Sequence, residues 1–254
     1  MSDKRVCVVT GSSAGIGAST ALLFAQNGYD VVINYSREVG PAEAVAAKCR
    51  EAGADVLVVR ANIADDAQCV ALADAAAKRW GHVDTLINNA GTATKPVDVK
   101  DLAGLSAQDF QDTFAVNVIG TFQMSRAVAP LMAGRANASI VNISSMAAVM
   151  GTGSSIAYAT SKGAVNTLTL SLARSLAPSI RVNAILPGLV NSDWMRNRVG
   201  PEQFEIRVKR YAGRALLNGV IEPDEAASTA FWLANDAVKV TGQLINLDAG
   251  FQLG

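Results

Sequence analysis

The chain has 254 residues, and its 22 Lys and Arg residues balance 22 Asp and Glu residues, so the formal net charge is zero. A neutral chain lacks the positive charge that general binders of nucleic acid or of anionic membranes use, so neither partner is expected. Charged residues make up 17% and hydrophobic residues 50% of the chain, which predicts a large core and contacts between subunits. With no linker rich in Pro or Ser, residues 1–254 are expected to form one domain.

Three cysteines stand far apart among apolar or helical residues, at Cys7, Cys49 and Cys69. This pattern favours free, buried thiols in a reducing compartment over disulfides. The first apolar run reaches Gly11 too soon to form the core of a secretion signal, so we expect a cytoplasmic protein. The uncharged stretch 136–161 is interrupted too often by Ser, Gly, Asn and Thr to predict a membrane span.

Apolar runs rich in β-branched residues alternate with longer stretches of helical periodicity. Seven such runs predict strands, at residues 6–10, 31–35, 56–59, 85–90, 138–144, 181–188 and 243–250. Helical stretches separate the first four runs, at residues 15–27, 41–52 and 66–80. Pro41 suits a first helical turn, and Gly28 and Gly53 suit helix C-termini. Continuous apolar strands joined through helices predict a mostly parallel, doubly wound Rossmann-type α/β sheet with helices on both faces.

A long polar and aromatic insertion occupies residues 191–218, between two core elements. An insertion of this kind is typical of a lid over a substrate. Its residues Trp194, Met195 and Tyr211 could line the pocket or pack the lid against the core, and the sequence leaves both interpretations open.

The first strand leads directly into TGSSAGIG at 10–17 and then into a helix. Gly11, Gly15 and Gly17 follow a Gly-x3-Gly-x-Gly spacing rather than the usual Gly-x-Gly-x-x-Gly. In this arrangement N–H groups at the helix N-terminus face a pyrophosphate, and glycines let the backbone approach it. Such glycines can also form an ordinary tight turn, but their place after the first strand favours a dinucleotide site.

Tyr158 and Lys162 stand four residues apart, so a helix places both side chains on one face. An unperturbed Tyr has a pKa of about 10, and a cation about 4 Å away lowers it by roughly three pH units at most. The pair could therefore exchange a proton near neutral pH. Alternatively Tyr158 packs and Lys162 is solvated, because a Tyr-x3-Lys pair often arises by chance.

Six motifs occur in one order along the chain: TGSSAGIG at 10–17, NNAG at 88–91, Asn117 in FAVNVIG, Ser145 in NISSMA, YATSK at 158–162 and PGLVNS at 187–192. Together they resemble the classical short-chain dehydrogenase/reductase family, in particular its 3-oxoacyl-carrier-protein reductase and glucose dehydrogenase-like members. The resemblance covers almost the whole chain. It implies an oxidoreductase that transfers hydride between nicotinamide and a carbonyl or secondary alcohol. We expect an NADPH-dependent ketoreductase of the 3-oxoacyl type or similar.

The resemblance implies catalytic roles for four side chains. Tyr158 gives or takes the proton at the substrate oxygen, and Ser145 hydrogen-bonds that oxygen. Lys162 holds the nicotinamide ribose and lowers the pKa of Tyr158, while Asn117 supports a water relay to Lys162. Ser145 is chosen over Ser144 because it stands thirteen residues before Tyr158, which is the family spacing.

The same resemblance implies a set of cofactor contacts. Besides Tyr158 and Lys162, these are Gly11, Ser13, Gly15, Ile16 and Gly17 in the glycine-rich turn, Asn62 and Ile63 after the third strand, Asn89, Ala90 and Gly91 after the fourth, and Pro187, Gly188, Val190 and Ser192 at the nicotinamide carboxamide. Asn62 replaces the family's usual Asp, but its amide oxygen can still accept a bond from the adenine amine. Asn88 is expected to be a structural amide between neighbouring strands.

Residues at the end of the second predicted strand favour NADP over NAD. A site that selects NAD has an acidic residue about twenty residues beyond the glycine turn, whereas Tyr35 occupies that place here. Ser36 and Arg37 offer a hydroxyl and a guanidinium to a 2′-phosphate. NAD stays possible, because Ala14 stands where NADP-dependent relatives often have a basic residue and Glu38 could neutralise Arg37.

The lone histidine, His82, is expected in a surface turn, and no cluster of His, Cys, Asp or Glu has metal-ligand spacing. Apolar faces within residues 106–132 and 158–177 predict a homotetramer, since relatives pair those helices between subunits. An alternative function is a catalytically idle dinucleotide sensor or scaffold of the same fold, but the intact set of four catalytic residues favours the enzyme. Acyl thioesters, sugars, steroids and small ketones all stay open as substrates.

Overall fold

All seven predicted strands form, and they pair in parallel in one sheet of order β3-β2-β1-β4-β5-β6-β7. The computed structural model describes residues 4–254. The strands are β1 (Val6–Val9), β2 (Asp30–Tyr35), β3 (Val56–Arg60), β4 (Thr85–Asn88), β5 (Ser139–Ile143), β6 (Arg181–Pro187) and β7 (Leu244–Leu247). The last strand is shorter than predicted because the chain turns at Asp248, whose carboxylate accepts bonds from the backbone N–H groups of Gly250 and Gln252, both at 3.0 Å.

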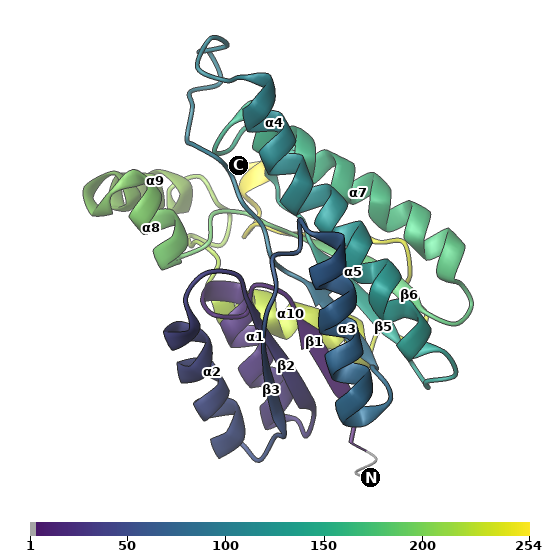
Figure 1. Ribbon diagram of the computed structural model, residues 1–254. Helices are drawn as coiled ribbons and strands as arrows, with labels where there is room; N and C mark the ends of the chain where they lie inside the picture. Colours follow the sequence, from purple (N-terminus) through teal and green to yellow (C-terminus); the bar gives the residue numbers. More distant parts are fainter. Residues whose placement is uncertain (1–3) are drawn as a thin grey trace.

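Helices cover both faces of the sheet, as Figure 1 shows. One layer consists of α1 (Gly15–Gln26), α2 (Val39–Glu51) and α10 (Pro223–Asn235). The other consists of α3 (Asp66–Trp80), α5 (Thr121–Val128) and α7 (Ile156–Leu176), with α4 (Ala107–Phe114) against α7. Other helical segments are α6 (Ala147–Met150), α8 (Asp193–Val199), α9 (Pro201–Ala212) and the 3-10 turns η2 (Ala129–Met132) and η3 (Phe251–Leu253).

The hydrophobic core lies in two layers because side chains alternate along each strand. Val6 and Val8 of β1 pack with α3, α5 and α7, whereas Cys7 and Val9 pack with α1, α2 and α10. All four residues are fully buried. Burial on both faces explains why β1 is a continuous apolar run, and the predicted Rossmann-type α/β fold is confirmed.

The predicted helix ends agree with the structure to within one residue, apart from the start of α2. Gly28 and Gly53 follow α1 and α2 with φ of 83° and 88°, a left-handed conformation that glycine adopts without strain. Helix α2 begins at Val39, two residues before the predicted start at Pro41. Pro41 therefore lies within the first turn, where its missing N–H has no helical partner to lose.

The three cysteines are free and buried, as expected. Burial raises the pKa of all three thiols, to about 11 for Cys49 and Cys69. They are therefore protonated at neutral pH and lack the thiolate that reactive cysteines use.

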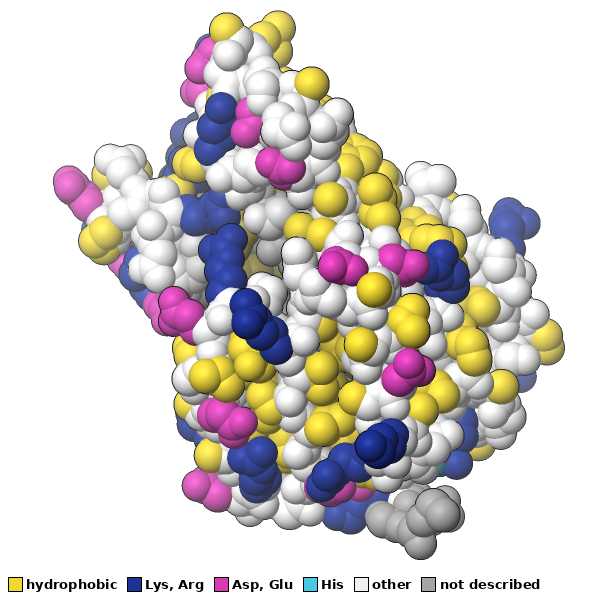
Figure 2. Space-filling view, viewed as in Figure 1, with side chains coloured by type: hydrophobic (Ala, Val, Ile, Leu, Met, Phe, Trp, Pro, Cys, Tyr) yellow, Lys and Arg dark blue, Asp and Glu magenta, His cyan; other side chains and the backbone are white. Residues whose placement is uncertain are grey.

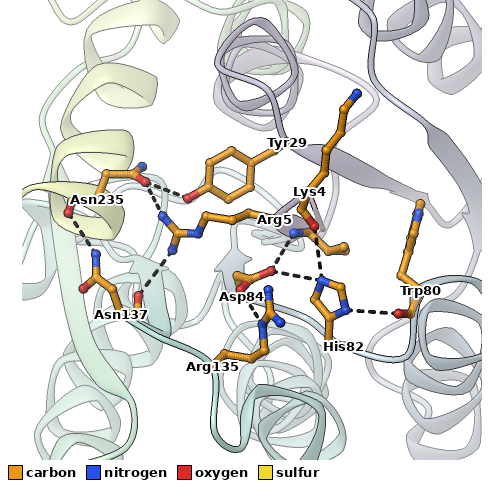
Figure 3. A network of polar contacts seen from close by, with 10 residues as sticks. Lys4, Arg5, Tyr29, Trp80, His82, Asp84, Arg135, Asn137 and Asn235 are labelled. Atoms are coloured by element: carbon orange, nitrogen blue, oxygen red, sulfur yellow. Dashed lines mark hydrogen bonds and ion pairs between the residues drawn. The ribbon is translucent and has the colours of Figure 1, made fainter. Parts of the chain in front are cut away.

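A network of polar contacts joins residues at the amino ends of the strands (Figure 3). The site described below lies at the opposite, carboxyl ends. The buried Asp84 carboxylate accepts bonds from the Val6 N–H at 2.8 Å and from Arg135 Nε at 2.7 Å. His82 Nε2 lies 3.5 Å from the same carboxylate, and its Nδ1 lies 3.0 Å from the Trp80 carbonyl oxygen. His82 thus belongs to a turn before β4 with a structural role.

The Asp84→Ala variant should lower the free energy of unfolding by about 3 kcal/mol, because it leaves a buried N–H and a guanidinium without their acceptor. Urea denaturation followed by circular dichroism measures this. The control is Asp74→Ala, which removes the same charge from an exposed position on α3 and should change stability by at most about 0.5 kcal/mol. Equal stabilities of the two variants would show that the Asp84 network contributes little.

The insertion at 191–218 contains helices α8 and α9, which project from one end of the sheet in Figure 1. The α9 residue Phe204 is fully buried, and the guanidinium carbon of Arg196 on α8 lies 4.7 Å from the centre of its ring. These contacts pack the two helices together. Within residues 4–254 the structure contains no helix long and apolar enough to cross a bilayer.

Candidate active site

The predicted site residues gather at the carboxyl ends of the parallel strands. Strand β1 lies between β2 and β4, so the chain continues from β1 towards one edge of the sheet and from β4 towards the other. Loops that leave β1 and β4 therefore diverge and leave a crevice, which is where ligands of such sheets bind.

The loop after β1 has the backbone geometry of an anion cradle. Gly11 and Gly15 have φ of 60° and 54°. A Cβ on Gly11 would lie 2.9 Å from Ala90 Cα, so only glycine fits there. Ala14 precedes α1 without a side-chain cap, and the first turn of the helix carries no acidic residue. The N–H groups of this helix end are thus free of a competing side-chain acceptor and suit a pyrophosphate.

Two asparagines support this loop through hydrogen bonds within the protein. Asn89 Nδ2 donates to the carbonyl oxygens of Thr10 and Gly11, both at 2.9 Å. Asn34 Oδ1 accepts from the Gly11 N–H at 3.0 Å, and its amide nitrogen donates to Ala61 O at 3.0 Å. Sequence reasoning missed Asn34, although a polar residue inside the apolar strand VVINY was its signal.

Asn88 ties β4 to its neighbours, as expected of a structural amide. Its Nδ2 donates to Asn142 Oδ1 on β5 at 2.9 Å and to Ser125 Oγ on α5 at 3.0 Å. These bonds fix the end of β4, from which the Asn89–Gly91 segment enters the crevice.

Tyr158 and Lys162 lie one turn apart on α7, on the face that meets the sheet. Ser155 caps the helix by accepting a bond from the Tyr158 N–H at 3.2 Å, which fixes the first turn. Lys162 is 4% exposed, and its Nζ donates to the Ile143 carbonyl oxygen at 2.6 Å. The ammonium lies 5.8 Å from the centre of the Tyr158 ring. The helix therefore brings the two groups together inside the protein.

Burial controls the ionisation of both groups. It lowers the pKa of Lys162 to about 8. It also raises the pKa of Tyr158, against the opposing effects of a hydrogen bond with Ser145 and of the Arg198 charge. The sequence-based expectation was the opposite for Tyr158, with Lys162 as the dominant influence. The difference arises because desolvation disfavours the phenolate more than the nearby donors and cations favour it.

The two adjacent serines after β5 have different surroundings. Ser144 is buried, and its Oγ donates to Asn166 Oδ1 at 2.6 Å on α7. Ser145 instead reaches the Tyr158 hydroxyl, and its Oγ accepts from the Ala147 N–H at 3.1 Å. Ser144 thus joins strand to helix, and Ser145 is the serine beside the phenol.

Asn117 lies in a π-helical segment, η1 (Ala115–Gly120), between α4 and α5. Its side chain accepts from the Thr92 N–H at 2.7 Å and donates to Thr92 O at 2.8 Å and to Ser161 Oγ at 2.9 Å. The wider turn points this amide inward and joins the loop after β4 to α7. Such π-bulges are frequent at functional sites.

Gly91 marks the space that Lys162 and Asn117 share. A Cβ on Gly91 would lie 3.5 Å from both Lys162 Nζ and Asn117 Oδ1. The Lys162 ammonium, the Asn117 amide oxygen and the Gly91 backbone therefore border one space close to the α1 N-terminus. These residues fit a dinucleotide whose phosphates meet α1 and whose nicotinamide ribose meets Lys162.

At the other end of the crevice, Tyr35 ends β2, and Ser36 and Arg37 are exposed beyond it. Within residues 4–254 no ion pair joins Arg37 to Glu38. Arg60, which the sequence analysis did not select, pairs in register with Tyr35, and its Nε donates to Ser36 O at 3.4 Å. Two guanidinium groups thus lie near the end of β2.

The neighbouring loop after β3 holds Asn62 and Ile63. Asn62 is exposed, and its Oδ1 accepts a bond from the Ala64 N–H at 3.2 Å, so one of the two lone pairs on that oxygen is used within the loop. Ile63 is buried against Gly120, where a Cβ would lie 2.8 Å from Ile63 Cγ1.

The segment after β6 borders the crevice. The Gly188 N–H donates to Leu247 O at 2.8 Å, Val190 pairs with Ile221, and Ser192 precedes α8. A Cβ on Gly15 would lie 3.9 Å from Ser192 Cβ, so this segment lies opposite the glycine-rich loop.

The sequence did not decide whether Trp194, Met195 and Tyr211 of the insertion line the pocket or pack the lid, and the structure places them differently. Met195 lines a cavity of about 370 Å³ near Tyr158, and the Trp194 ring centre lies 6.5 Å from that of Tyr158. Tyr211 instead stacks on Phe251 at 4.1 Å and donates its hydroxyl hydrogen to Asp248 O at 2.8 Å. Tyr211 thus holds the insertion to the body of the protein.

The fold and the crevice define an α/β protein whose glycine-rich loop suits a dinucleotide and whose crevice holds Tyr158 and Lys162. The model of the short chain dehydrogenase family matches residues 5–203. The chain therefore belongs to the short-chain dehydrogenase/reductase family, which confirms the resemblance seen in the sequence.

Individual relatives match the chain over nearly its full length. A structure described as a short-chain dehydrogenase/reductase from Burkholderia xenovorans is 43% identical, covers 100% of both chains and superposes with a TM-score of 0.92. A protein from Streptomyces violaceoruber, named as ketoacyl reductase 2 of the granaticin polyketide synthase, is 37% identical over 99% of this chain and 97% of its own. The 3-oxoacyl-acyl-carrier-protein reductase of Synechocystis is 33% identical over 97% and 96%.

Membership in this family makes the protein an oxidoreductase that acts on CH–OH or C=O groups of small molecules with a nicotinamide dinucleotide.

Proposed function

We propose that the protein is an NADPH-dependent ketoreductase that reduces a 3-oxoacyl-type or similar carbonyl to a secondary alcohol. The observation that carries this proposal is the convergence of the Tyr158 phenol, the Ser145 hydroxyl and the Lys162 ammonium beside the glycine-rich loop. The relatives from Streptomyces violaceoruber and Synechocystis, which are named as ketoacyl and 3-oxoacyl reductases, support the substrate class.

In the proposed reaction Tyr158 donates its phenolic proton to the carbonyl oxygen, and Ser145 donates a hydrogen bond to the same oxygen. Burial raises the pKa of Tyr158, so the phenol is protonated at neutral pH, which is the form that reduction needs. The nicotinamide dinucleotide supplies the hydride when bound. Lys162 holds the ribose hydroxyls and stabilises the phenolate that proton transfer leaves, and Asn117 positions α7 beside it through Ser161. Residues 191–218 act as the lid that excludes water.

The absorbance of NADPH at its reduced-nicotinamide band tests the substrate class. We expect 3-oxoacyl compounds to be reduced with a higher kcat/KM than simple ketones, and aldohexoses to be poor substrates for the reverse reaction with NADP. Faster oxidation of an aldohexose than reduction of any 3-oxoacyl compound would overturn the substrate class while leaving the family assignment intact.

The proposed preference for NADPH rests on Ser36 and Arg37, with Arg60 as a second cation near them. A charge-assisted hydrogen bond contributes about 1.5–3 kcal/mol, so Arg37→Ala should weaken NADPH binding by about 10- to 100-fold and leave NADH binding nearly unchanged. Dissociation constants from nicotinamide fluorescence measure both. The control is Arg50→Ala on α2, whose guanidinium pairs with Glu43 at 3.2 Å instead. Tighter NADH binding in the parent, or an unchanged ratio in Arg37→Ala, would contradict the proposal.

A homotetramer is proposed from apolar side chains left exposed on two helical faces. Ile119 and Phe122 are 50% and 41% exposed near α5, and Leu170 on α7 is 41% exposed. Figure 2 shows hydrophobic side chains along this side of the molecule. Light scattering should give about four times the chain mass of 26.4 kDa. A double variant with Phe122→Arg and Leu170→Arg should give smaller species, whereas a parent that is monomeric at micromolar concentration would refute the assembly.

A further inference from the structure

The cavity near Tyr158 has a wall made by the lid. Segments 96–99 and 152–154 form one side of this space of about 370 Å³, and Met195, Arg198 and Arg207 lie among the lid residues of the other. A Cβ on Gly153 would lie 3.6 Å from Tyr158 Cδ1, so the cavity adjoins the ring of the proposed proton donor. A substrate carbonyl at Tyr158 would therefore extend its remaining atoms towards these two arginines.

Arg198 is partly buried, and no carboxylate among the described residues pairs with it. Its Nε is buried and has no hydrogen-bond partner, and within residues 4–254 it forms no ion pair. Its guanidinium carbon lies 4.7 Å from the centre of the Trp194 ring. Arg196, two residues earlier, takes the nearby carboxylates of the lid, Asp193 at 3.1 Å and Glu205 at 3.9 Å. The lid thus satisfies one arginine and leaves the one that lines the cavity free for a ligand.

The charges around Arg198 favour an anion. Arg207 lines the same cavity, and burial together with repulsion from Arg37 lowers the pKa of Arg198 against the opposing effect of Tyr158. Lys and Arg side chains follow the groove between the α8–α9 projection and the body of the molecule in Figure 2. Asp98 supplies the one carboxylate among the described lining residues, and its Oδ1 accepts a bond from the Lys100 N–H at 2.8 Å. An anionic ligand would relieve this excess of positive charge.

We propose that Arg198 binds a carboxylate that the substrate carries close to its reacting carbonyl, which narrows the 3-oxoacyl-type or similar carbonyl of the proposed function to a short free oxo acid rather than a carrier-bound thioester, a neutral ketone or a sugar. This rests on the proposed function, because it takes Tyr158 as the proton donor. Arg198 and Tyr158 both lie beside Trp194, since the guanidinium carbon is 4.7 Å from the centre of the Trp194 ring and the Tyr158 ring centre is 6.5 Å from it. A carboxylate a few bonds from the carbonyl spans such a distance, whereas the phosphate at the far end of a pantetheine arm does not.

Acetoacetate and its uncharged methyl ester form a matched pair of probes for the test. The parent should reduce acetoacetate with the higher kcat/KM. Arg198→Gln should lower kcat/KM for acetoacetate by about 10- to 100-fold, mainly through KM, and leave the methyl ester nearly unchanged. Arg198→Lys should keep part of the preference, because it keeps a point charge without the fork geometry. The control is Arg210→Gln, which removes an exposed charge from α9 outside the cavity lining and should change neither substrate.

Equal losses for acid and ester in Arg198→Gln would overturn the inference, and so would faster reduction of the ester by the parent. The cofactor phosphates are the other anion that Arg198 could bind, and the dissociation constant of NADPH tests this alternative. Weaker NADPH binding by Arg198→Gln would assign Arg198 to those phosphates instead of to the substrate. Calorimetric titration of acetoacetate into the protein saturated with NADP reads binding without turnover. Binding that Arg198→Gln abolishes supports the inference even if neither probe is reduced, and that lack of reduction would count against the proposed function alone.

Discussion

Tyr158→Phe is expected to lower kcat by about 10²- to 10⁴-fold while leaving the dissociation constant of NADPH within a few-fold of the parent value. The variant removes only the hydroxyl that gives its proton to the carbonyl oxygen. The phenylalanine ring can still pack against Trp194 and beneath Lys162, so the fold and the cofactor contacts persist. Steady-state kinetics by NADPH absorbance and cofactor titration by fluorescence measure the two quantities on the same preparation.

A matched control for this variant is Tyr211→Phe, which also removes one phenolic hydroxyl. Tyr211 donates to Asp248 O at 2.8 Å and stacks on Phe251, and it is not among the groups that shift the pKa of Tyr158. Its loss should reduce stability more than it reduces the chemical step. If Tyr158→Phe kept turnover within a few-fold of the parent, another group would have to supply the proton.

Lys162→Ala should impair both chemistry and cofactor binding, which distinguishes it from Tyr158→Phe. Its ammonium lies in the space beside Gly91 that suits the nicotinamide ribose, and charged hydrogen bonds of this kind contribute about 1.5–3 kcal/mol. We therefore expect NADPH binding to weaken by about 10- to 100-fold in addition to a large loss of kcat. Lys48→Ala, at an exposed position on α2, removes the same charge elsewhere and should leave both quantities unchanged.

The pH dependence of NADPH binding adds an independent readout for Lys162. Burial lowers the pKa of this residue to about 8 in the cofactor-free protein, so the ammonium loses its proton as the pH rises through that value. A bound cofactor that prefers the charged form should then bind more weakly above about pH 8, and the decline should be absent in Lys162→Ala. A parent whose affinity is flat from pH 7 to pH 10 would argue against contact between Lys162 and the cofactor.

The fold was predictable because short stretches of sequence determine its strands and helix ends. Each buried strand is a continuous apolar run, and residues such as Gly28 mark helix ends by the backbone conformation they permit. The order of the motifs then identified the family. Tyr158 and Lys162 were expected to come together because the spacing of four residues fixes their relation on any helix.

Other features depend on tertiary contacts that no spacing reveals. Helical periodicity does not distinguish the π-helical turn at Asn117 from an ordinary helix, so the sequence did not reveal this turn. The pKa of Tyr158 depends on how completely the fold buries the phenol. Its spacing from Lys162 predicted a lowered pKa, whereas burial raises it. Arg60 and Arg198 reach their places through strand pairing and the path of the lid, which a charge count along the chain does not show.

A reductase oxidises its bound NADPH when a carbonyl compound is added, whereas an idle dinucleotide sensor of the same fold does not. The direct measurement mixes the protein with an equimolar amount of NADPH, adds excess of a 3-oxoacyl compound from a panel that includes free acids, and follows reduced-nicotinamide absorbance. The account predicts complete loss of the absorbance with at least one member of the panel, and retention of it in Tyr158→Phe over the same time. NADPH that binds the parent tightly but stays reduced with every carbonyl compound, ketones and sugars included, would contradict the assignment of a reductase.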